Sequence, residues 1–278
     1  MMDPNNFSLK IRSHNINGFS NSKSFLYQEC NEKNFSILAV QEHWLRPAYR
    51  KINGINQLKI LHPDFDAFSI SAMDKQMENS ILKGRPYGGT GFVFNKDLTN
   101  VLRARIDLNH SRVSVMELRT VSFDVLLINA YMPYYDPNNL SEHLDDYCAT
   151  LAHIEHIMIT HPTHKYVLLM DMNCDIFKTN HPYSIQINSM MNDFGLISTF
   201  QHMPGFDHKV EFTRYDVKKN SYTLIDGILI SDSLSSCVES CSIIHPPTNV
   251  SDHLPIDVVL NLQIDPKALR QTKLIQNC

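Results

Sequence analysis

The sequence lacks the long apolar segments that are typical of membrane-spanning helices. It also lacks the excess of basic residues that is typical of proteins that bind nucleic acid nonspecifically. No stretch approaches the roughly 20 apolar residues that a membrane helix needs, and the N-terminus has no apolar run after a basic start. The formal net charge is −4, which excludes a global basic surface of the kind that drives tight nonspecific nucleic-acid binding. We therefore expect a soluble, unsecreted protein without membrane contact, in which any nucleic-acid contact depends on a local patch.

Close cysteine pairs, linkers and repeats are also scarce or missing. The six cysteines include one close pair, Cys237 and Cys241, which is typical of neither a disulfide framework nor a zinc knuckle. No Pro-, Ser- or Gly-rich linker, repeat or low-complexity tract divides the chain. We therefore predict one domain over residues 1–265, followed by a C-terminal tail at 266–278.

Two patterns resemble functional motifs only in part. The segment Gly88-Gly89-Thr90-Gly91 lacks the Gly-Lys-Ser/Thr ending of a phosphate-binding loop, and we interpret it as a turn that enters a strand. His153, His156, His161 and His164 are spaced closely enough for a metal cluster, but two lie on an expected helix and two flank a proline. We interpret these four as solvated histidines and assign them no role.

Short apolar runs recur along the whole chain, and their length and β-branched content predict buried strands. These runs are Leu9 to Ile11, Ile37 to Val40, Phe92 to Phe94, Val113 to Val115, Val125 to Ile128, Val167 to Met170, Ile228 to Ile230 and Ile256 to Leu260. Helical patterns are fewer, and the clearest begins at Asn139, with Glu142 placed as in a capping box. Many strands, few helices and no regular βαβ alternation favour a mixed or antiparallel sheet sandwich flanked by helices.

Several of these runs end directly on polar residues of the kinds that bind ligands. The strand ends carry Gln41-Glu42, Tyr131-Met132-Pro133 and Asp171-Met172-Asn173. Asp226 and the triplet Ser251-Asp252-His253 add further acids and an imidazole. Because strand ends hold reactive groups rigidly while their loops open to solvent, these positions are candidates for one shared site.

The mixture of residue types suits the cleavage of a phosphodiester. That reaction needs a hard cation held by oxygen ligands, a base that activates water, and hydrogen-bonding groups that stabilise charge on the phosphate. Carboxylates supply the first two, and asparagine and histidine supply the third.

In their order along the chain, the motifs resemble those of the endonuclease/exonuclease/phosphatase superfamily, and most closely those of the apurinic-type endonuclease domains of LINE-class (non-LTR) retrotransposons. The motifs are His14-Asn15-Ile16-Asn17-Gly18, Gln41-Glu42-His43-Trp44, Tyr131-Met132-Pro133, Asp171-Met172-Asn173, Ile225-Asp226 and Ser251-Asp252-His253-Leu254-Pro255. The resemblance covers Leu9 to about Leu262. It implies a DNase I-like, four-layered α/β sandwich with two packed mixed β-sheets flanked by helices.

The resemblance also implies a metal site and a base. Glu42 would bind Mg²⁺ or Mn²⁺, and Asn15 and Asp252 would lie close to the metal and the phosphate. Asp171 would orient and deprotonate the attacking water, with Asn173 beside it on the phosphate.

The remaining motif residues would hold the substrate and stabilise the developing charge. His253 would contact the phosphoryl oxygen while Asp226 holds the imidazole in place, and Tyr131 would contact the scissile phosphate or the leaving oxygen. Asn17 and Ser251 are assigned to the substrate.

The activity implied is a divalent-metal-dependent DNA endonuclease that nicks a double-stranded target, acting as a monomer, and in the nucleus if it serves retrotransposition. Asn17 replaces the Asp of abasic-site repair enzymes, which favours the retrotransposon branch. Tyr134 and Tyr135 stand where repair enzymes carry a DNA-contacting Asn, and Met170 stands where Gly is common. These departures argue against a dedicated abasic-site activity and indicate different local packing.

Two alternatives remain at this point. The same fold acts on other phosphoesters, including RNA, inositol phosphates and lipids, and a non-catalytic relic or interaction module is a second alternative. Arg112 is a candidate for direct substrate contact and belongs to a scattered basic set from which a local nucleic-acid patch is expected. The other members are Arg119, Arg214, Lys218 and Lys219.

Overall fold

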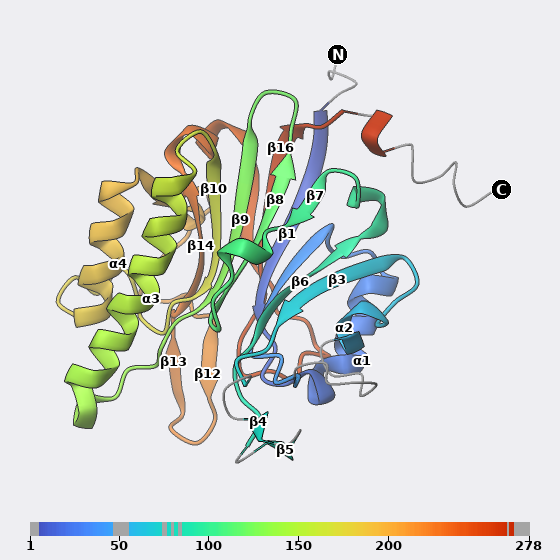
Figure 1. Ribbon diagram of the computed structural model, residues 1–278. Coiled ribbons are helices and arrows are strands. Elements are labelled where there is room, and N and C mark those ends of the chain that lie inside the picture. Colours follow the sequence, from blue (N-terminus) through green and yellow to red (C-terminus); the bar gives the residue numbers. More distant parts are fainter. Residues whose placement is uncertain are drawn as a thin grey trace.

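Two six-stranded sheets form the centre of the molecule (Figure 1). The computed structural model describes residues 6–46, 56–73, 77–78, 81–82, 85–265 and 267–269. The first sheet has the order β15 (Val238–Ile243), β16 (Ile256–Gln263), β1 (Asn6–Asn15), β2 (Ile37–Gln41), β6 (Thr90–Asn95) and β3 (Phe65–Ile70). The second has the order β11 (Leu196–Ser198), β14 (Asp226–Ser231), β10 (Lys165–Asp171), β9 (Asp124–Tyr131), β8 (Val113–Arg119) and β7 (Leu102–Ala104).

Helices cover the outer face of each sheet, which gives four layers (Figure 1). The first sheet is covered by α1 (Phe19–Asn31) and α2 (Asn56–Lys59), and the second by α3 (Leu140–Thr160) and α4 (Pro182–Asp193). Two small hairpins pair β4 (Met77–Glu78) with β5 (Ile81–Leu82) and β12 (Arg214–Asp216) with β13 (Ser221–Thr223). Short 3-10 helices within the described residues span Lys96–Leu98, Ile106–Leu108, Pro137–Asn139, Thr199–His202 and Asp232–Cys237. None of the helices that can be described here is long and apolar enough to cross a membrane.

The central strands are apolar on both faces because both faces are covered. In β6, Phe92 and Phe94 pack into the core between the sheets, whereas Val93 packs beneath α1 and α2. In β9, Leu127 faces the same inter-sheet core and Leu126 faces α3 and α4. Successive side chains of a strand point to opposite faces, so a strand buried on both sides appears in the sequence as a continuous apolar run.

The predicted fold class is confirmed. Each of the eight apolar runs lies within a strand, and both sheets are mixed, because β1 pairs parallel with β2 and β9 pairs parallel with β10. The helix expected at Asn139 begins at Leu140, but the prediction of a capping box was wrong. The Asn139 side chain makes no capping bond to the backbone and instead donates to the Glu142 carboxylate at 2.8 Å.

Two helices and the end of the chain differ from the sequence-based picture. The helices α1 and α4 had no clear sequence signal, because their buried residues are separated by Ser, Asn and Gln. The predicted tail lies mostly outside the described residues. Within it, Ala268 and Leu269 pack against the inter-sheet core, and the domain boundary at 265 stays a prediction.

Two buried amide side chains join the sheets near one end. Gln41 of β2 donates through Nε2 to Oδ1 of Asn129 in β9 at 2.7 Å. Asn129 in turn donates to the carbonyl oxygens of Val40 at 3.0 Å and Gly91 at 2.8 Å. Because a buried amide costs free energy unless it is hydrogen-bonded, this contact fixes β2 and β9 relative to each other. Glu42 and Tyr131, which lie at the ends of these strands, are therefore held in a defined relation.

Candidate active site

The polar strand ends predicted from the sequence meet at one end of the two sheets. Asn15 at the end of β1 pairs with Gln41 at the end of the parallel strand β2. Asp171 at the end of β10 pairs with Tyr131 of the parallel strand β9 on one side and with Asp226 at the start of β14 on the other. Parallel strands end at the same edge, and an antiparallel neighbour begins there, so the register gathers the side chains within each sheet. The packing of the two sheets then brings the two groups together.

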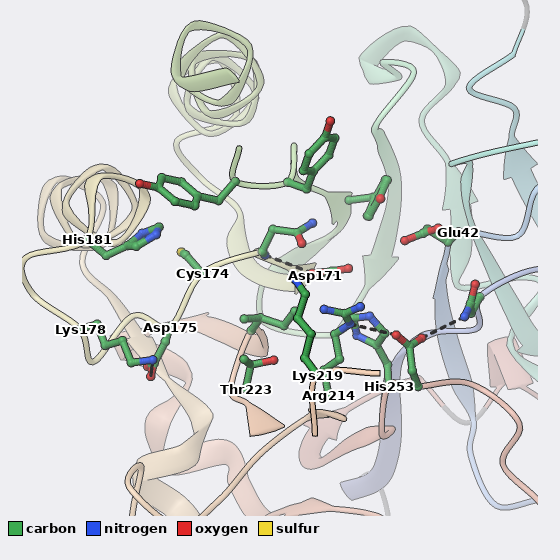
Figure 2. A pocket seen from close by; sticks show the side chains of 17 residues that line it. Glu42, Asp171, Cys174, Asp175, Lys178, His181, Arg214, Lys219, Thr223 and His253 are labelled. Atoms are coloured by element: carbon green, nitrogen blue, oxygen red, sulfur yellow. Dashed lines mark hydrogen bonds and ion pairs between the residues drawn. The ribbon is translucent and has the colours of Figure 1, made fainter. Parts of the chain in front are cut away.

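The gathered side chains surround an open cavity of about 620 Å³. Figure 2 shows Glu42 on one side of it, Lys178 and His181 on the other, and Asp171 between them. Arg214 and Lys219, from the β12–β13 hairpin and its turn, also line the opening.

Asn15 connects two of the carboxylates. Its Nδ2 donates to Oε1 of Glu42 at 3.0 Å and to Oδ2 of Asp171 at 2.8 Å. Asp171 is 1% exposed, and its other oxygen accepts from the backbone N–H of Asn173 at 3.1 Å. The Asn173 amide is held by a bond from its Nδ2 to the carbonyl oxygen of Met132 at 2.8 Å. The side chains of Asn15, Glu42, Asp171 and Asn173 are therefore held in place before any substrate binds.

A second chain of contacts runs through Asp252. Asn17 Nδ2 donates to Oδ1 of Asp252 at 3.0 Å, and Arg214 Nε donates to Oδ2 at 2.9 Å. Ser251 holds this segment against β1, since its Oγ donates to the carbonyl oxygen of Asn15 at 2.7 Å and accepts from the N–H of His253 at 3.1 Å. Ser251 thus positions its neighbours.

His253 and Asp226 form a buried pair. His253 Nδ1 lies 3.0 and 2.9 Å from the two carboxylate oxygens of Asp226. Burial by itself lowers the pKa of His253, but the charge and hydrogen bond of Asp226 outweigh it and raise that pKa to about 9. The imidazole is therefore positively charged at neutral pH.

Burial has the opposite effect on the two acidic groups beside this pair. Burial, followed by the negative charge of Asp226, raises the pKa of Asp171 to about 7, and the charge of His253 and a hydrogen bond from Asn15 only partly offset this. Burial and the charges of Glu42 and Asp171 raise the pKa of Tyr131 well above its ordinary value. Asp171 thus exchanges protons near neutrality, whereas Tyr131 stays a neutral hydrogen-bond donor.

The loop that carries Glu42 has a strained backbone. Glu42 and Trp44 have φ values of 52° and 57°, a region that side-chain-bearing residues seldom adopt. The Trp44 indole donates to Oε2 of Glu42 at 3.0 Å and lies against Gly18, where an added Cβ would sit 2.5 Å from Cε3 of the indole. Glycine at position 18, with φ of 93°, is what permits this close approach. The strain and the indole together aim the Glu42 carboxylate.

His43 holds the same loop and must be neutral to do so. Its Nδ1 accepts from the N–H of Leu45 at 2.9 Å, so the proton is on Nε2, which faces the carbonyl oxygen of Ile70 at 2.9 Å. Burial lowers the pKa of His43 from 6.5 to about 4. A group with a depressed folded-state pKa stabilises the fold fully above pH 6.5 and loses that contribution as pH falls toward 4, because the unfolded chain binds the proton first.

We therefore expect the His43→Gln variant to lose less stability on acidification than the wild type. Between pH 7 and pH 5, titration of His43 alone removes roughly 2 kcal/mol of the unfolding free energy. Urea unfolding at several pH values measures this slope, and His156→Gln, a change at an exposed histidine of α3, is the matched control. Equal slopes for the wild type and His43→Gln would contradict the neutral, proton-excluding role of His43.

The donor set suits an oxygen-ligated divalent cation. Glu42, Asp171, Asp226 and Asp252 bring four carboxylates to one site, where His253 and Arg214 offset only part of their charge. Among the described residues, two groups of three donors lie within 4.8 Å of one another, and the buried one is Asp171, Asp226 and His253. Because the imidazole Nδ1 of that group is occupied by Asp226, the half-buried carboxylates of Glu42 and Asp252 fit a hard cation better.

Ten of the eleven predicted site residues contribute to this region. Seven line the cavity, three support them from beneath, and Arg112 lies in the neighbouring groove instead. The lining residues are Asn17, Glu42, Tyr131, Asp171, Asn173, Asp252 and His253, and the supporting ones are Asn15, Asp226 and Ser251.

The sequence-based set missed several residues and misplaced others. Arg214 was expected only in a general basic patch, but it binds Asp252 directly. Arg119 lies at the far end of β8, paired with Asp124 at the opposite end of β9 from Tyr131. Gln41 was expected only as part of the motif at the end of its strand, without its bond to Asn129. Asn129 had no signal beyond being a polar residue within an apolar strand. That signal, an amide inside a continuous apolar run, is one from which an inter-sheet bond could have been predicted.

Comparison with known proteins identifies structural relatives. No protein-family model and no curated protein matches the chain. Among solved structures, the AP endonuclease LMAP from Leishmania major has a TM-score of 0.71 at 15% identity and covers 94% of this chain and 89% of its own. The endonuclease domain of TRAS1, a telomere-specific non-LTR retrotransposon, has a TM-score of 0.65 at 14% identity and covers 92% of this chain and 100% of its own.

A third relative is a 3′ phosphatase, NExo from Neisseria, bound to a product DNA hairpin. Its TM-score is 0.63 at 17% identity, with 91% of this chain and 99% of that chain covered. Likeness at this level of identity establishes the fold. The chain therefore has the same DNase I-like fold as these structures.

Proposed function

We propose that the chain is a divalent-metal-dependent endonuclease that hydrolyses DNA phosphodiester bonds and leaves a 3′-hydroxyl and a 5′-phosphate. The single observation that carries this proposal is the meeting in one cavity of a buried carboxylate, held by Asn15 and Asn173, and an imidazole held by the carboxylate of Asp226. Asp171 is the first group and His253 the second, with their pKa values raised to about 7 and about 9. Such a separation between two titrating groups is what a base and a charge-stabilising acid require.

The residues of the cavity divide the work of the reaction. Asp171 takes the proton of the attacking water, and Asn15 and Asn173 keep its carboxylate in position. His253, oriented through Nδ1 by Asp226, donates from Nε2 to a phosphoryl oxygen as negative charge develops. The neutral Tyr131 hydroxyl donates to the scissile phosphate or the leaving oxygen.

Glu42 would hold Mg²⁺ or Mn²⁺, with Asn15 and Asp252 beside it, and Asn17 and Arg214 keep Asp252 oriented. When bound, the cation supplies positive charge that offsets the charge of the phosphate.

A DNA substrate is supported by the surroundings of the cavity and by the structural relatives. Arg214, Lys219 and Lys178 line the opening, where they offer phosphate contacts despite the net negative charge of the chain. LMAP is an AP endonuclease, and TRAS1 contributes an endonuclease domain of a retrotransposon. Asn17 favours the retrotransposon type, and in that setting the nick would prime reverse transcription.

The decisive test is nicking of supercoiled plasmid in Mg²⁺ and in Mn²⁺, with EDTA as the removal control. We expect nicking that EDTA abolishes, and we expect Glu42→Gln to need on the order of tenfold more Mg²⁺ for half-maximal rate, since it replaces a carboxylate donor by a neutral amide. Glu32→Gln, at an exposed glutamate that follows α1, is the matched control.

Two results would count against the proposal. Nicking that persists in EDTA would remove the metal from the mechanism. Absence of nicking in both metals, together with turnover of RNA, an inositol phosphate or a lipid phosphoester, would move the substrate to another class of the same fold.

A further inference from the structure

A second groove adjoins the candidate active site and has no part in the chemistry described above. It measures about 650 Å³, within the range of pockets that hold small molecules. Tyr131 and Tyr134 line both the groove and the catalytic cavity, so the two spaces share one wall. A ligand that fills the groove therefore lies next to the catalytic cavity, where the scissile phosphate would bind.

Aromatic and apolar surfaces form much of this groove. Tyr87 is 40% exposed and Tyr134 is 54% exposed, so parts of both rings are available to a ligand. Ile70 and Ala72 together contribute an apolar surface to the groove. Flat, exposed aromatic rings beside a small apolar surface are typical of sites that stack nucleobases.

The positively charged side chain of Arg112 lies at the boundary between the groove and the catalytic cavity. The Arg112 guanidinium carbon lies 5.4 Å from the centre of the Tyr131 ring, and Nη1 lies 3.4 Å from the Tyr131 carbonyl oxygen. Arg112 lines the groove together with Tyr87. A guanidinium held in this way binds a phosphate group that lies beside a stacked base.

The groove is tied to the loop that carries Glu42. The carbonyl oxygen of Gly88, next to Tyr87, accepts from the N–H of Trp44 at 2.9 Å. Gly88 has φ of 58°, and an added Cβ there would lie 2.8 Å from Cβ of Ala72, so the segment is packed closely against its neighbour. Tyr87 is consequently fixed relative to the candidate metal ligand.

We propose that this groove takes one unpaired nucleobase adjacent to the scissile phosphate, stacked against Tyr87 and Tyr134, with Arg112 on the neighbouring phosphate. The inference rests on the proposed function and adds a substrate preference to it. A base inside a duplex is covered on both faces by its neighbours, so it enters the groove only after leaving the stack. DNA that already carries an unpaired base next to the cleavage position avoids that cost and is the preferred substrate.

The test compares two hairpin DNAs that differ by one unpaired 2-aminopurine beside the nicking position. Binding is measured by fluorescence anisotropy in Mg²⁺, with the Asp171→Ala change present in every protein so that the DNA stays intact. We expect about tenfold tighter binding of the hairpin with the unpaired base, equivalent to about 1.4 kcal/mol, and quenched 2-aminopurine emission.

The variants separate stacking from general effects. Tyr87→Ala is expected to bring the ratio of the affinities for the two hairpins close to one and to remove the quenching of 2-aminopurine emission. Tyr87→Phe is expected to keep the affinity ratio and the quenching, because it keeps the aromatic ring. Tyr27→Ala is the matched control, since Tyr27 is an exposed tyrosine of α1 outside both cavities.

Each outcome decides between the groove and the proposed function. Equal affinity for the two hairpins, with emission unchanged on binding, overturns the groove as a base site even if the wild type nicks plasmid. A preference that Tyr87→Ala abolishes supports the groove even if the wild type cleaves no DNA, in which case the proposed endonuclease alone fails. A preference that survives Tyr87→Ala and Tyr134→Ala also overturns the inference.

Discussion

Replacing Asp171 by Asn is expected to lower the single-turnover nicking rate by roughly 10²–10⁴-fold, the contribution typical of a general base. Asn has nearly the same shape but cannot accept the proton of water. The substitution also places an amide N–H₂ against a donor in either orientation, because one oxygen of Asp171 accepts from Asn15 at 2.8 Å and the other from the N–H of Asn173 at 3.1 Å. The loss therefore combines the missing base with a disturbed contact to Glu42.

The dependence of the wild-type nicking rate on pH is a second test of Asp171 as the base. Because the pKa of Asp171 is raised to about 7, the fraction of ionised base rises as pH increases through that value, and the nicking rate rises with it. Asp124→Asn, at the opposite end of β9 from Tyr131, is the matched control and should retain the wild-type rate. A loss smaller than about tenfold in Asp171→Asn, with the fold intact by circular dichroism, would transfer the role of base to another residue.

Replacing Asp226 by Asn is expected to reduce nicking at pH 7.5 by about 10²–10³-fold, comparable to the loss of one donor to a developing oxyanion. The neutral amide no longer holds the charge of His253, whose remaining environment is buried. Burial then lowers the pKa of His253 from its native value of about 9, so that the imidazole loses its proton near neutrality.

The change also acts on Asp171, and this gives the prediction a direction. The charge of Asp226 raises the pKa of Asp171 and the charge of His253 lowers it, so the loss of both charges has opposing effects on that pKa. The limb of the pH profile that reports His253 should therefore move to lower pH in Asp226→Asn, whereas the limb that reports Asp171 should move less. His253→Gln should lose a similar rate at pH 7.5 but recover nothing at lower pH, because glutamine does not titrate.

A profile measured from pH 5 to pH 10 under single-turnover conditions separates these cases. An Asp226→Asn profile that keeps the wild-type limbs and is merely scaled down would contradict the coupling between Asp226, His253 and Asp171. Thermal melts of each variant at the pH values used keep partial unfolding from being mistaken for a change in chemistry.

The predicted strands were confirmed because their signal is local. A strand buried on both faces needs four or more consecutive apolar residues, so β2, β9 and β10 are visible in any short window of the chain. The short edge strands β7 and β11 carry too few residues for such a window. The helices α1 and α4 were missed because tertiary packing, rather than a continuous apolar stripe, stabilises them.

The site residues that could be predicted from the sequence are those that lie at the ends of predicted strands. Glu42, Tyr131 and Asp171 follow or end apolar runs directly, and the strand register then brings Tyr131 and Asp171 side by side. The contact between Arg214 and Asp252 had no such signal, because Arg214 comes from a small hairpin that the sequence did not reveal. Arg112 was expected at the substrate, and its place on the Tyr131 ring in the second groove depends on how β8 pairs with β9.

The amino-acid sequence by itself determined the strand segments and the acids, amides and imidazole at their ends, on which the proposed chemistry rests, because these are properties of consecutive residues. Only the tertiary structure decided which side chains act on each other. Ser251 and Asn15 are 236 residues apart in the chain and meet at 2.7 Å only after β16 pairs with β1. The raised pKa values of Asp171 and His253 likewise arise from burial and from the proximity of Asp226, which exist only once the two sheets have packed.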